Sequence, residues 1–94
     1  MRYTCDNFKE EKVERGERCS VGIFGEAIYA VRIFVADGHN CYHSEYYRIT
    51  KEEFADYPVN AEMLIEKYYH GHSCFLCSDY MGKSHGTYGR VFSN

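Results

Sequence analysis

The run AIYAVRIFVA, residues 27–36, restricts the fold of this chain more than any other feature. Its β-branched and aromatic residues favour a strand, and apolar side chains occupy both of its alternating sets. A strand of this kind needs cover on both faces, so we expect it at the centre of a sheet. Turn residues follow at 37–40, and CYHSEYYRIT, residues 41–50, predicts a second strand that completes a β-hairpin.

The length of this turn predicts the register of the hairpin. A four-residue loop sets Ala36 opposite Cys41 and Arg32 opposite Glu45. The second pair brings opposite charges together across the strands, which is favourable in an antiparallel sheet.

A short helix is predicted to begin after Thr50. Thr50 and Glu53 have the capping-box spacing, in which each side chain accepts a hydrogen bond from the other residue's backbone N–H. Ile49 and Phe54 are spaced as a hydrophobic staple around it. Pro58 disfavours helical conformation at the residue before it, so we expect the helix to end there.

The main helix is predicted over about residues 61–70. Asn60 is suited to its N-cap, and Val59 and Leu64 have the spacing of a second staple. Apolar residues at helical spacing form one stripe that we expect to face the sheet. They are Ala61, Leu64, Ile65 and Tyr68.

The end of the chain reads as a second hairpin. Residues 73–81 and 87–93 have the character of strands, and residues 82–86 form the loop, which sets Leu76 opposite Phe92. The charged stretch 9–18 is open to a short helix or an exposed loop. We therefore expect an α+β fold, with a small antiparallel sheet built from two hairpins and both helices packed on one face.

Composition indicates a single folded domain spanning residues 1–94. A hydrophobic content of 45% with one proline is typical of folded chains. The net charge of −3 disfavours binding to nucleic acid, which depends on clustered basic residues. No apolar run approaches the ~20 residues of a membrane-spanning helix. Five cysteines, an odd number, favour a reducing compartment, so we expect a cytoplasmic protein.

A candidate zinc site lies in HGHSCFLC, residues 70–77. Cys74 and Cys77 have C-x2-C spacing, and His70 and His72 precede them, so thiolate and imidazole ligands are available. A second pair at matching spacing is missing from the sequence. If these residues form a strand, the two cysteines point to opposite faces, which favours ordinary structural cysteines and no cofactor.

The loop GKSHG is a candidate ligand loop. Its first three residues match the end of a phosphate-binding loop, but Cys77 occupies the position where that motif has its first glycine. A hairpin turn is the simpler explanation of the glycines and is the one we favour. The loop residues are Gly82, Lys83, Ser84, His85 and Gly86.

Tyrosines and acidic residues predict a contact surface. The chain has ten tyrosines, and the neighbours in each doublet, Tyr46–Tyr47 and Tyr68–Tyr69, are expected to differ in burial. Tyrosine is enriched in recognition surfaces because its large ring carries a polar tip. Carboxylates concentrated between Glu52 and Glu66 suit a basic partner. The predicted contact residues are Tyr42, Tyr46, Tyr47, Tyr69, Glu52, Glu53, Asp56, Glu62 and Glu66.

These features favour a small, non-enzymatic intracellular protein-binding module. We expect an inhibitor or adaptor that occupies the surface of a host or effector protein, as phage and mobile-element proteins that block host defence do. A zinc-containing or small-ligand-binding domain is an alternative, and so is a small hydrolase or transferase whose groups converge from distant positions. A homodimer formed through a sheet edge or a tyrosine face is also open.

Overall fold

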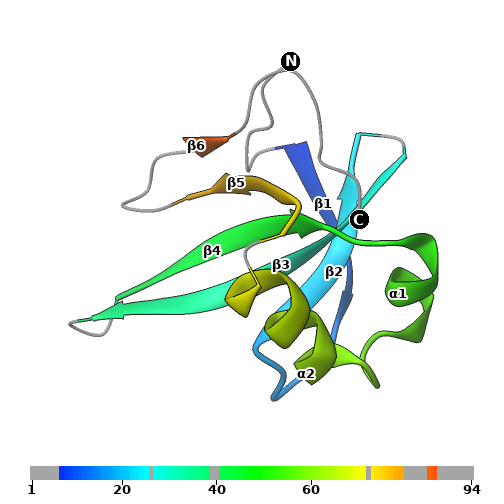
Figure 1. Cartoon of the computed structure of the whole chain (residues 1–94), viewed down its shortest axis with the longest axis horizontal. Coiled ribbons are helices and arrows are strands. Elements are labelled where there is room, and N and C mark those ends of the chain that lie inside the picture. The colour runs from blue at the N-terminus through cyan, green and yellow to red at the C-terminus, as the bar shows by residue number, and fades with distance from the viewer. Residues whose placement is uncertain (1–6, 26, 39–40, 72, 80–84, 87–94) are drawn as a thin grey trace.

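The strands form one antiparallel sheet in which each strand lies beside its neighbours in the chain (Figure 1). The computed structural model describes residues 7–25, 27–38, 41–71, 73–79 and 85–86. The strands are β1 (Phe8–Val13), β2 (Cys19–Phe24), β3 (Ile28–Gly38), β4 (Cys41–Arg48), β5 (Phe75–Ser78) and β6 (His85–Gly86). Since short helices lie between β4 and β5, the predicted α+β class is confirmed.

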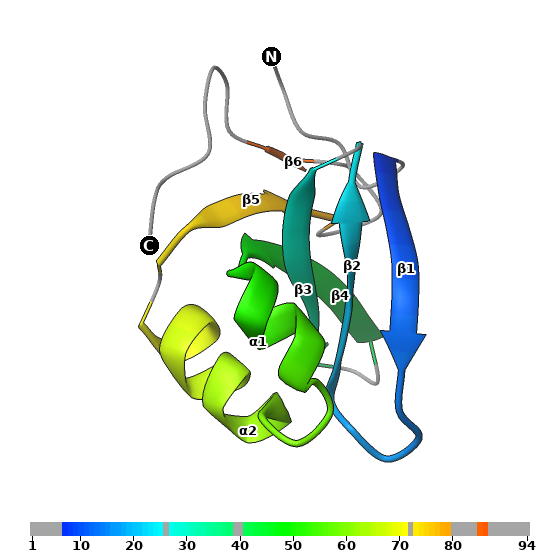
Figure 2. The same ribbon diagram turned by 90° about the vertical axis from the view of Figure 1, so that its right-hand side faces the viewer.

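Helical segments connect β4 to β5. Helix α1 covers Lys51–Asp56, and α2 covers Ala61–Leu64 and continues as a π-helix, η2, over Ile65–His70. The predicted main helix at 61–70 is therefore helical throughout, but its second part has the wider π-helical turn. Figure 2 shows both helices on the same side of β1, β2 and β3, with β5 crossing near the ends of these strands. In the described part of the chain, no helix is long and apolar enough to cross a membrane.

The apolar run at 27–36 lies in β3, inside the sheet, as predicted. β3 pairs with β2 on one side and with β4 on the other. Its side chains alternate between the two faces, and Ala30, Val31 and Ile33 are all buried. Both faces of this strand are therefore covered.

The register of the β3–β4 hairpin differs by one residue from the prediction. Arg32 faces Tyr46 instead of Glu45, and the predicted cross-strand ion pair is wrong because Arg32 and Glu45 lie on opposite faces. The pairing is irregular between Ala36 and Gly38, because β3 continues two residues farther than expected and one residue bulges. The pairs beside the turn are Ala36–Tyr42 and Gly38–Cys41.

Two strands precede the run that dominates the sequence, so the sheet is larger than two hairpins. The stretch 9–18, expected to be a helix or a loop, contributes most of β1. In the described sheet β1 pairs with β2 alone and is therefore an edge strand. Exposed charged side chains on an edge strand discourage pairing with another chain. At β2, Gly22 allows β1 to approach closely, because a Cβ there would collide with the Lys9 carbonyl oxygen.

The second hairpin has a register different from the prediction. Cys77 pairs with Gly86 and Ser78 with His85, two residues that were expected in the loop, whereas the expected pairing of Leu76 with Phe92 involves a residue outside the described ones. His85 and Gly86 therefore belong to β6 instead of the loop. The other candidate loop residues, Gly82, Lys83 and Ser84, lie outside the described residues, as do 87–93.

Buried side chains form two clusters, and neighbouring residues of one strand belong to different clusters. Val31 and Tyr47 belong to the helix-side cluster, whereas the adjacent Ala30 and Tyr46 belong to the other. This division follows from the alternation of side chains along a strand. From the helices, the first cluster includes Tyr57, Ala61, Leu64, Ile65 and Tyr68.

Candidate protein-binding surface

Glu53 links the two helices from a buried position. The predicted capping box is confirmed: Thr50 N–H donates to Glu53 Oε1 at 2.9 Å, and Glu53 N–H donates to Thr50 Oγ1 at 3.1 Å. The carboxylate also accepts hydrogen bonds from Tyr68 Oη (2.5 Å) and Lys67 Nζ (2.9 Å). Glu53 is therefore not part of an exposed contact surface, contrary to the prediction, because its oxygens are used inside the fold.

These hydrogen bonds also determine the charge of Glu53. Burial raises the pKa of the carboxyl, but the donors from Thr50, Tyr68 and Lys67 outweigh it, so the pKa is lower than the usual 4.5. The group is ionised at neutral pH and serves the helix junction.

The turn between the helices differs from the predicted second staple. Asn60 is at the N-terminus of α2, as predicted, but its side chain makes no capping hydrogen bond. Its Nδ2 instead donates to the carbonyl oxygen of Glu53 at 2.9 Å, which ties the turn to α1. Val59 is 95% exposed, so it does not pack on Leu64 and the staple prediction is wrong.

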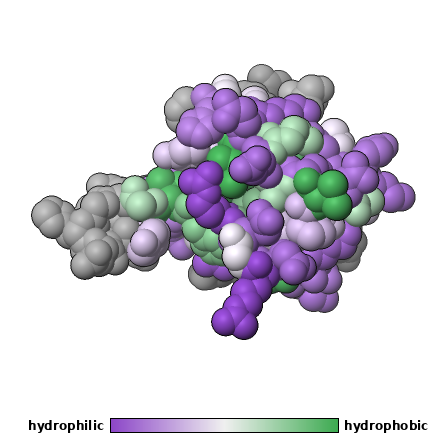
Figure 3. Space-filling model, turned by 90° about the horizontal axis from the view of Figure 1, so that it is seen from below, coloured by the Kyte–Doolittle hydropathy of each residue, from purple (hydrophilic) through white to green (hydrophobic). Residues whose placement is uncertain are grey.

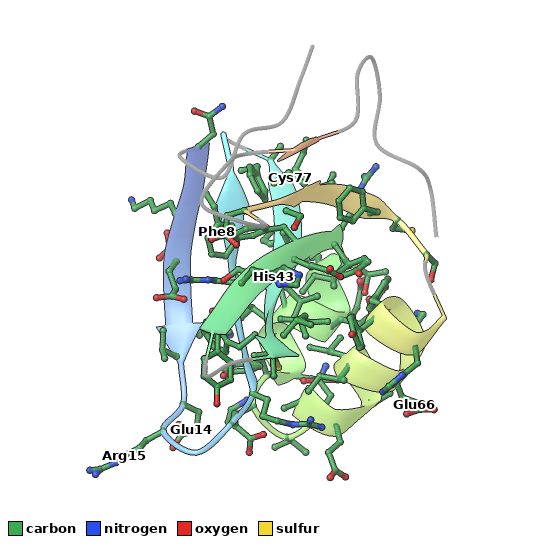
Figure 4. All side chains as sticks on the ribbon, turned by 90° about the vertical axis from the view of Figure 1, so that its left-hand side faces the viewer. Phe8, Glu14, Arg15, His43, Glu66 and Cys77 are labelled. Carbon is green, nitrogen blue, oxygen red and sulfur yellow. The ribbon has the colours of Figure 1, made fainter. Side chains whose placement is uncertain are left out.

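An acidic helical surface remains after Glu53 is removed from the predicted set. We define it by four carboxylates and two apolar side chains, all exposed, and the apolar ones are Val59, at 95%, and Met63, at 43%. Seen from below in Figure 3, mostly hydrophilic side chains surround separate hydrophobic ones. Figure 4 shows Glu66 projecting away from the sheet. The acidic helical surface consists of Glu52, Asp56, Val59, Glu62, Met63 and Glu66.

A small hollow adjoins this surface, between the start of β2, the end of β3 and η2. Its volume is about 140 Å³, and Arg18, Ile33, Val35, Ile65, Tyr69 and His70 are among its lining residues. A neighbouring depression shares Arg18, Ile65 and His70 and adds Glu62, Met63 and Glu66. The acidic helical surface therefore continues into a partly apolar recess.

The tyrosines divide into buried and exposed groups in an unexpected way. Tyr46 and Tyr47 are 4% and 1% exposed, so neither contributes to a contact face and the prediction for these two is wrong. Tyr42, at 72%, is exposed on the protruding β3–β4 hairpin (Figure 1), and Tyr69 is half-buried at the hollow. Both residues of the first doublet are buried because both faces of β4 are covered.

Tyr46 and Tyr47 have different surroundings on the two faces of β4. Tyr46 makes edge contacts with the rings of Phe8 and Phe24. On the opposite face, Tyr47 Oη donates to Glu45 Oε1 at 2.6 Å. The pKa of Tyr47 is raised mainly by burial and to a smaller extent by the Glu45 carboxylate. Glu45 Oε2 also lies 2.9 Å from His43 Nε2, so the three side chains form a row along β4.

The candidate zinc ligands are separated in the described structure. His70 is exposed on η2, whereas Cys74 and Cys77 are buried in different core clusters. Burial raises the pKa of the Cys74 thiol. His72 lies outside the described residues, and the described ones contain no group of three potential metal ligands. Zinc binding stays a prediction.

A polar row on the sheet was missed by the sequence interpretation. Ser20 Oγ donates to Glu10 Oε2, and Arg32 contacts the same oxygen at 3.4 Å while its Nε donates to Ser44 Oγ at 2.8 Å. These residues connect β1 to β4 on the face opposite the helices. The alternation of side chains along each strand was the available signal for which face these residues occupy. Recognising that they contact one another across strands required the strand order.

The sequence interpretation also missed three residues of the acidic helical surface and the recess. Val59 was assigned to a staple, Met63 lies off the predicted apolar stripe, and Arg18 lies in the stretch left open as helix or loop. An apolar residue beside acidic neighbours on the polar side of a helix was the available signal for Met63. No protein-family model, curated protein or solved structure matches the chain, so its function is inferred from these side chains.

Proposed function

We propose that this protein is a protein-binding module that occupies a surface of a basic partner protein through its acidic helical surface. The observation that carries the proposal is the exposure of Val59 and Met63 among four carboxylates that are not used inside the fold. Protein interfaces combine apolar and polar side chains, and this surface offers both kinds.

Charge supports a basic partner. Lys51 is the one exposed basic residue among residues 51–66, where Glu52, Asp56, Glu62 and Glu66 are exposed. The whole chain has a net charge of −3, which adds to the local field. Such a surface accelerates encounter with a positively charged partner and disfavours acidic ones.

Occupation of a partner surface is how inhibitors and adaptors act, and it needs no catalytic group. The proposal therefore retains the expected role of a cytoplasmic inhibitor or adaptor, including a phage or mobile-element protein that blocks a host or effector protein. Exposed Tyr42 on the β3–β4 hairpin provides a second contact, separate from the acidic helical surface.

Capture from a cell lysate tests the proposal. Wild-type protein and the double variant Glu62→Lys/Glu66→Lys are immobilised, and the bound proteins are identified by mass spectrometry. We expect the wild type to retain a basic protein in a salt-sensitive manner and the variant to lose it.

The matched control is Glu14→Lys/Glu17→Lys, which changes the net charge equally at exposed positions after β1. Figure 4 shows Glu14 on the side of the molecule away from Glu66. We expect this control to retain the partner. Equal loss in both variants, or a partner kept by Glu62→Lys/Glu66→Lys, would contradict the proposed surface.

A further inference from the structure

We propose that the partner is recognised through an aromatic side chain next to an arginine or lysine. The hollow beside η2 receives the aromatic side chain, and Glu62 and Glu66 bind the adjacent basic group. This inference rests on the proposed function, because it names the chemistry of the partner at the same surface.

The size and lining of the hollow suit a single side chain. Its volume of about 140 Å³ is below the ~300 Å³ at which typical small-molecule sites begin. Ile33 and Ile65 are buried and contribute apolar lining, and Val35 is half-buried beside them. Anchoring residues of protein interfaces are commonly aromatic side chains that fill a recess on the partner.

Arg18 and Tyr69 favour an aromatic occupant over an aliphatic one. The Tyr69 ring lies 5.1 Å from the His70 ring in an edge arrangement, so aromatic groups already line one side. Arg18 is exposed, and no described residue forms an ion pair with it. A guanidinium without a carboxylate partner is available to lie over a bound ring, which adds a cation–π attraction.

The depression next to the hollow favours a basic group. Glu62 and Glu66 line it together with Met63 and outnumber the one guanidinium there, that of Arg18, and Glu66 has a weak contact of 3.9 Å to His70. The aliphatic stem of an arginine or lysine can cover Met63 while its charged end reaches a carboxylate. The shared lining of the two recesses places the aromatic and basic groups on neighbouring parts of the partner.

The π-helix gives an independent reason to place a site here. Ser73 N–H donates to the carbonyl oxygen of Tyr68, five residues earlier, so the wider turn continues to the end of η2. π-Helical turns are rare and occur frequently at functional sites, and the side chains of interest are those within the wider turn. Here these side chains are Tyr69 and His70, which line the hollow.

The test is an NMR titration of the full chain with two dipeptide probes, N-acetyl-Arg-Phe-amide and N-acetyl-Glu-Phe-amide. We expect the first probe to shift the backbone amides of Val35, Ile65 and Tyr69 in a saturable manner. The second should bind about 2- to 5-fold more weakly, the range for an exposed charge pair. No saturable shift at these amides, or equal binding of both probes, would overturn the inference.

Variants separate the two parts of the recess. Glu62→Gln/Glu66→Gln should remove the preference for the arginine probe, whereas the matched control Glu11→Gln/Glu14→Gln, at exposed positions outside the acidic helical surface, should keep it. Tyr69→Ala should weaken both probes, with a well-dispersed spectrum showing that the variant is folded. A preference that survives Glu62→Gln/Glu66→Gln contradicts the assigned carboxylates.

Two further outcomes distinguish this inference from the proposed function. Probe binding without capture of any protein contradicts the proposed function, and capture without probe binding contradicts the role of the hollow alone. A third outcome is a dimer, detected by native mass spectrometry, in which the second copy protects the backbone amides of the hollow. That outcome would contradict the inference that the hollow binds a separate basic partner.

Discussion

Glu52 and Glu53 are neighbours in α1, yet their surroundings are opposite. Glu53 is buried and accepts hydrogen bonds from Thr50, Lys67 and Tyr68, while Glu52 is exposed. A carboxylate whose oxygens are satisfied inside the fold contributes to folding, and one left in solvent is available for a partner. The difference depends on the donors that the fold brings to each side chain, since the residue type is the same.

The largest effect that this comparison predicts is on folding stability. Glu53→Ala leaves Tyr68, Lys67 and the N–H of Thr50 without their acceptor, so we expect a loss of about 2–4 kcal/mol in the free energy of unfolding. Because the side chain of Lys67 is partly exposed and regains water, the loss should stay within that range. Urea denaturation followed by circular dichroism measures it.

Glu52→Ala is the matched control for this prediction. It removes the same side chain one position earlier, and we expect a change within about 0.5 kcal/mol. Equal unfolding midpoints for the two variants would show that Glu53 is not the hydrogen-bonded centre of the helix junction.

Tyrosine provides a parallel comparison with a smaller expected effect. Tyr57 Oη donates to the carbonyl oxygen of Cys19 at 2.6 Å and accepts from the N–H of Glu14 at 3.1 Å, which joins the helical segment to β2. Tyr57→Phe should lower stability by about 1–2 kcal/mol, because two partners of a partly buried hydroxyl are lost. Tyr42→Phe, at an exposed position, should leave the unfolding midpoint unchanged, and a similar loss there would weaken the comparison.

Acid titration separates the charge of Glu53 from its size. Burial raises its pKa but hydrogen bonds lower it further, so the folded pKa lies below the usual 4.5 of the unfolded chain. The stabilisation is therefore fully present above 4.5 and is lost as pH falls through the folded pKa. The loss should be smaller than for Glu53→Ala, because a protonated carboxyl still forms hydrogen bonds.

Thermal unfolding at a series of pH values measures this loss. Glu53→Gln should show a shallower decline below 4.5 than the wild type, and Glu52→Gln should follow the wild type. Identical acid profiles for Glu53→Gln and the wild type would mean that Glu53 is not stabilised in its ionised form.

Features of the fold that depend on nearby residues could be predicted from the sequence. The capping box at Thr50 and the buried strand in 27–36 each depend on a short local pattern. β1 was missed because its charged residues are typical of a helix or loop unless it is known to be an edge strand. The irregularity between Ala36 and Gly38 also changed the hairpin register, and the sequence has no local signal for it.

The candidate site was less predictable because burial depends on what covers each face. Alternation correctly places Tyr46 and Tyr47 on opposite faces, but it does not indicate that both faces are covered. Likewise, Glu53 has the same sequence signal as Glu52, and Tyr68 comes from another helix to bind it. The hollow is formed by Arg18, just before β2, and by residues from β3 and η2, so the strand order was needed to bring Arg18 near Tyr69.

The smallest expected effect is at Val59, where stability and binding should separate. Val59→Ser replaces a side chain that is 95% exposed, so we expect the free energy of unfolding to change by less than about 0.5 kcal/mol. Capture of the basic partner should nevertheless fall, because one of the two exposed apolar side chains of the acidic helical surface is lost. A destabilisation as large as that of Tyr57→Phe would mean that Val59 is packed in the fold. If both stability and capture are unchanged, Val59 is not part of the contact with the partner, and the proposed contact depends on the carboxylates alone.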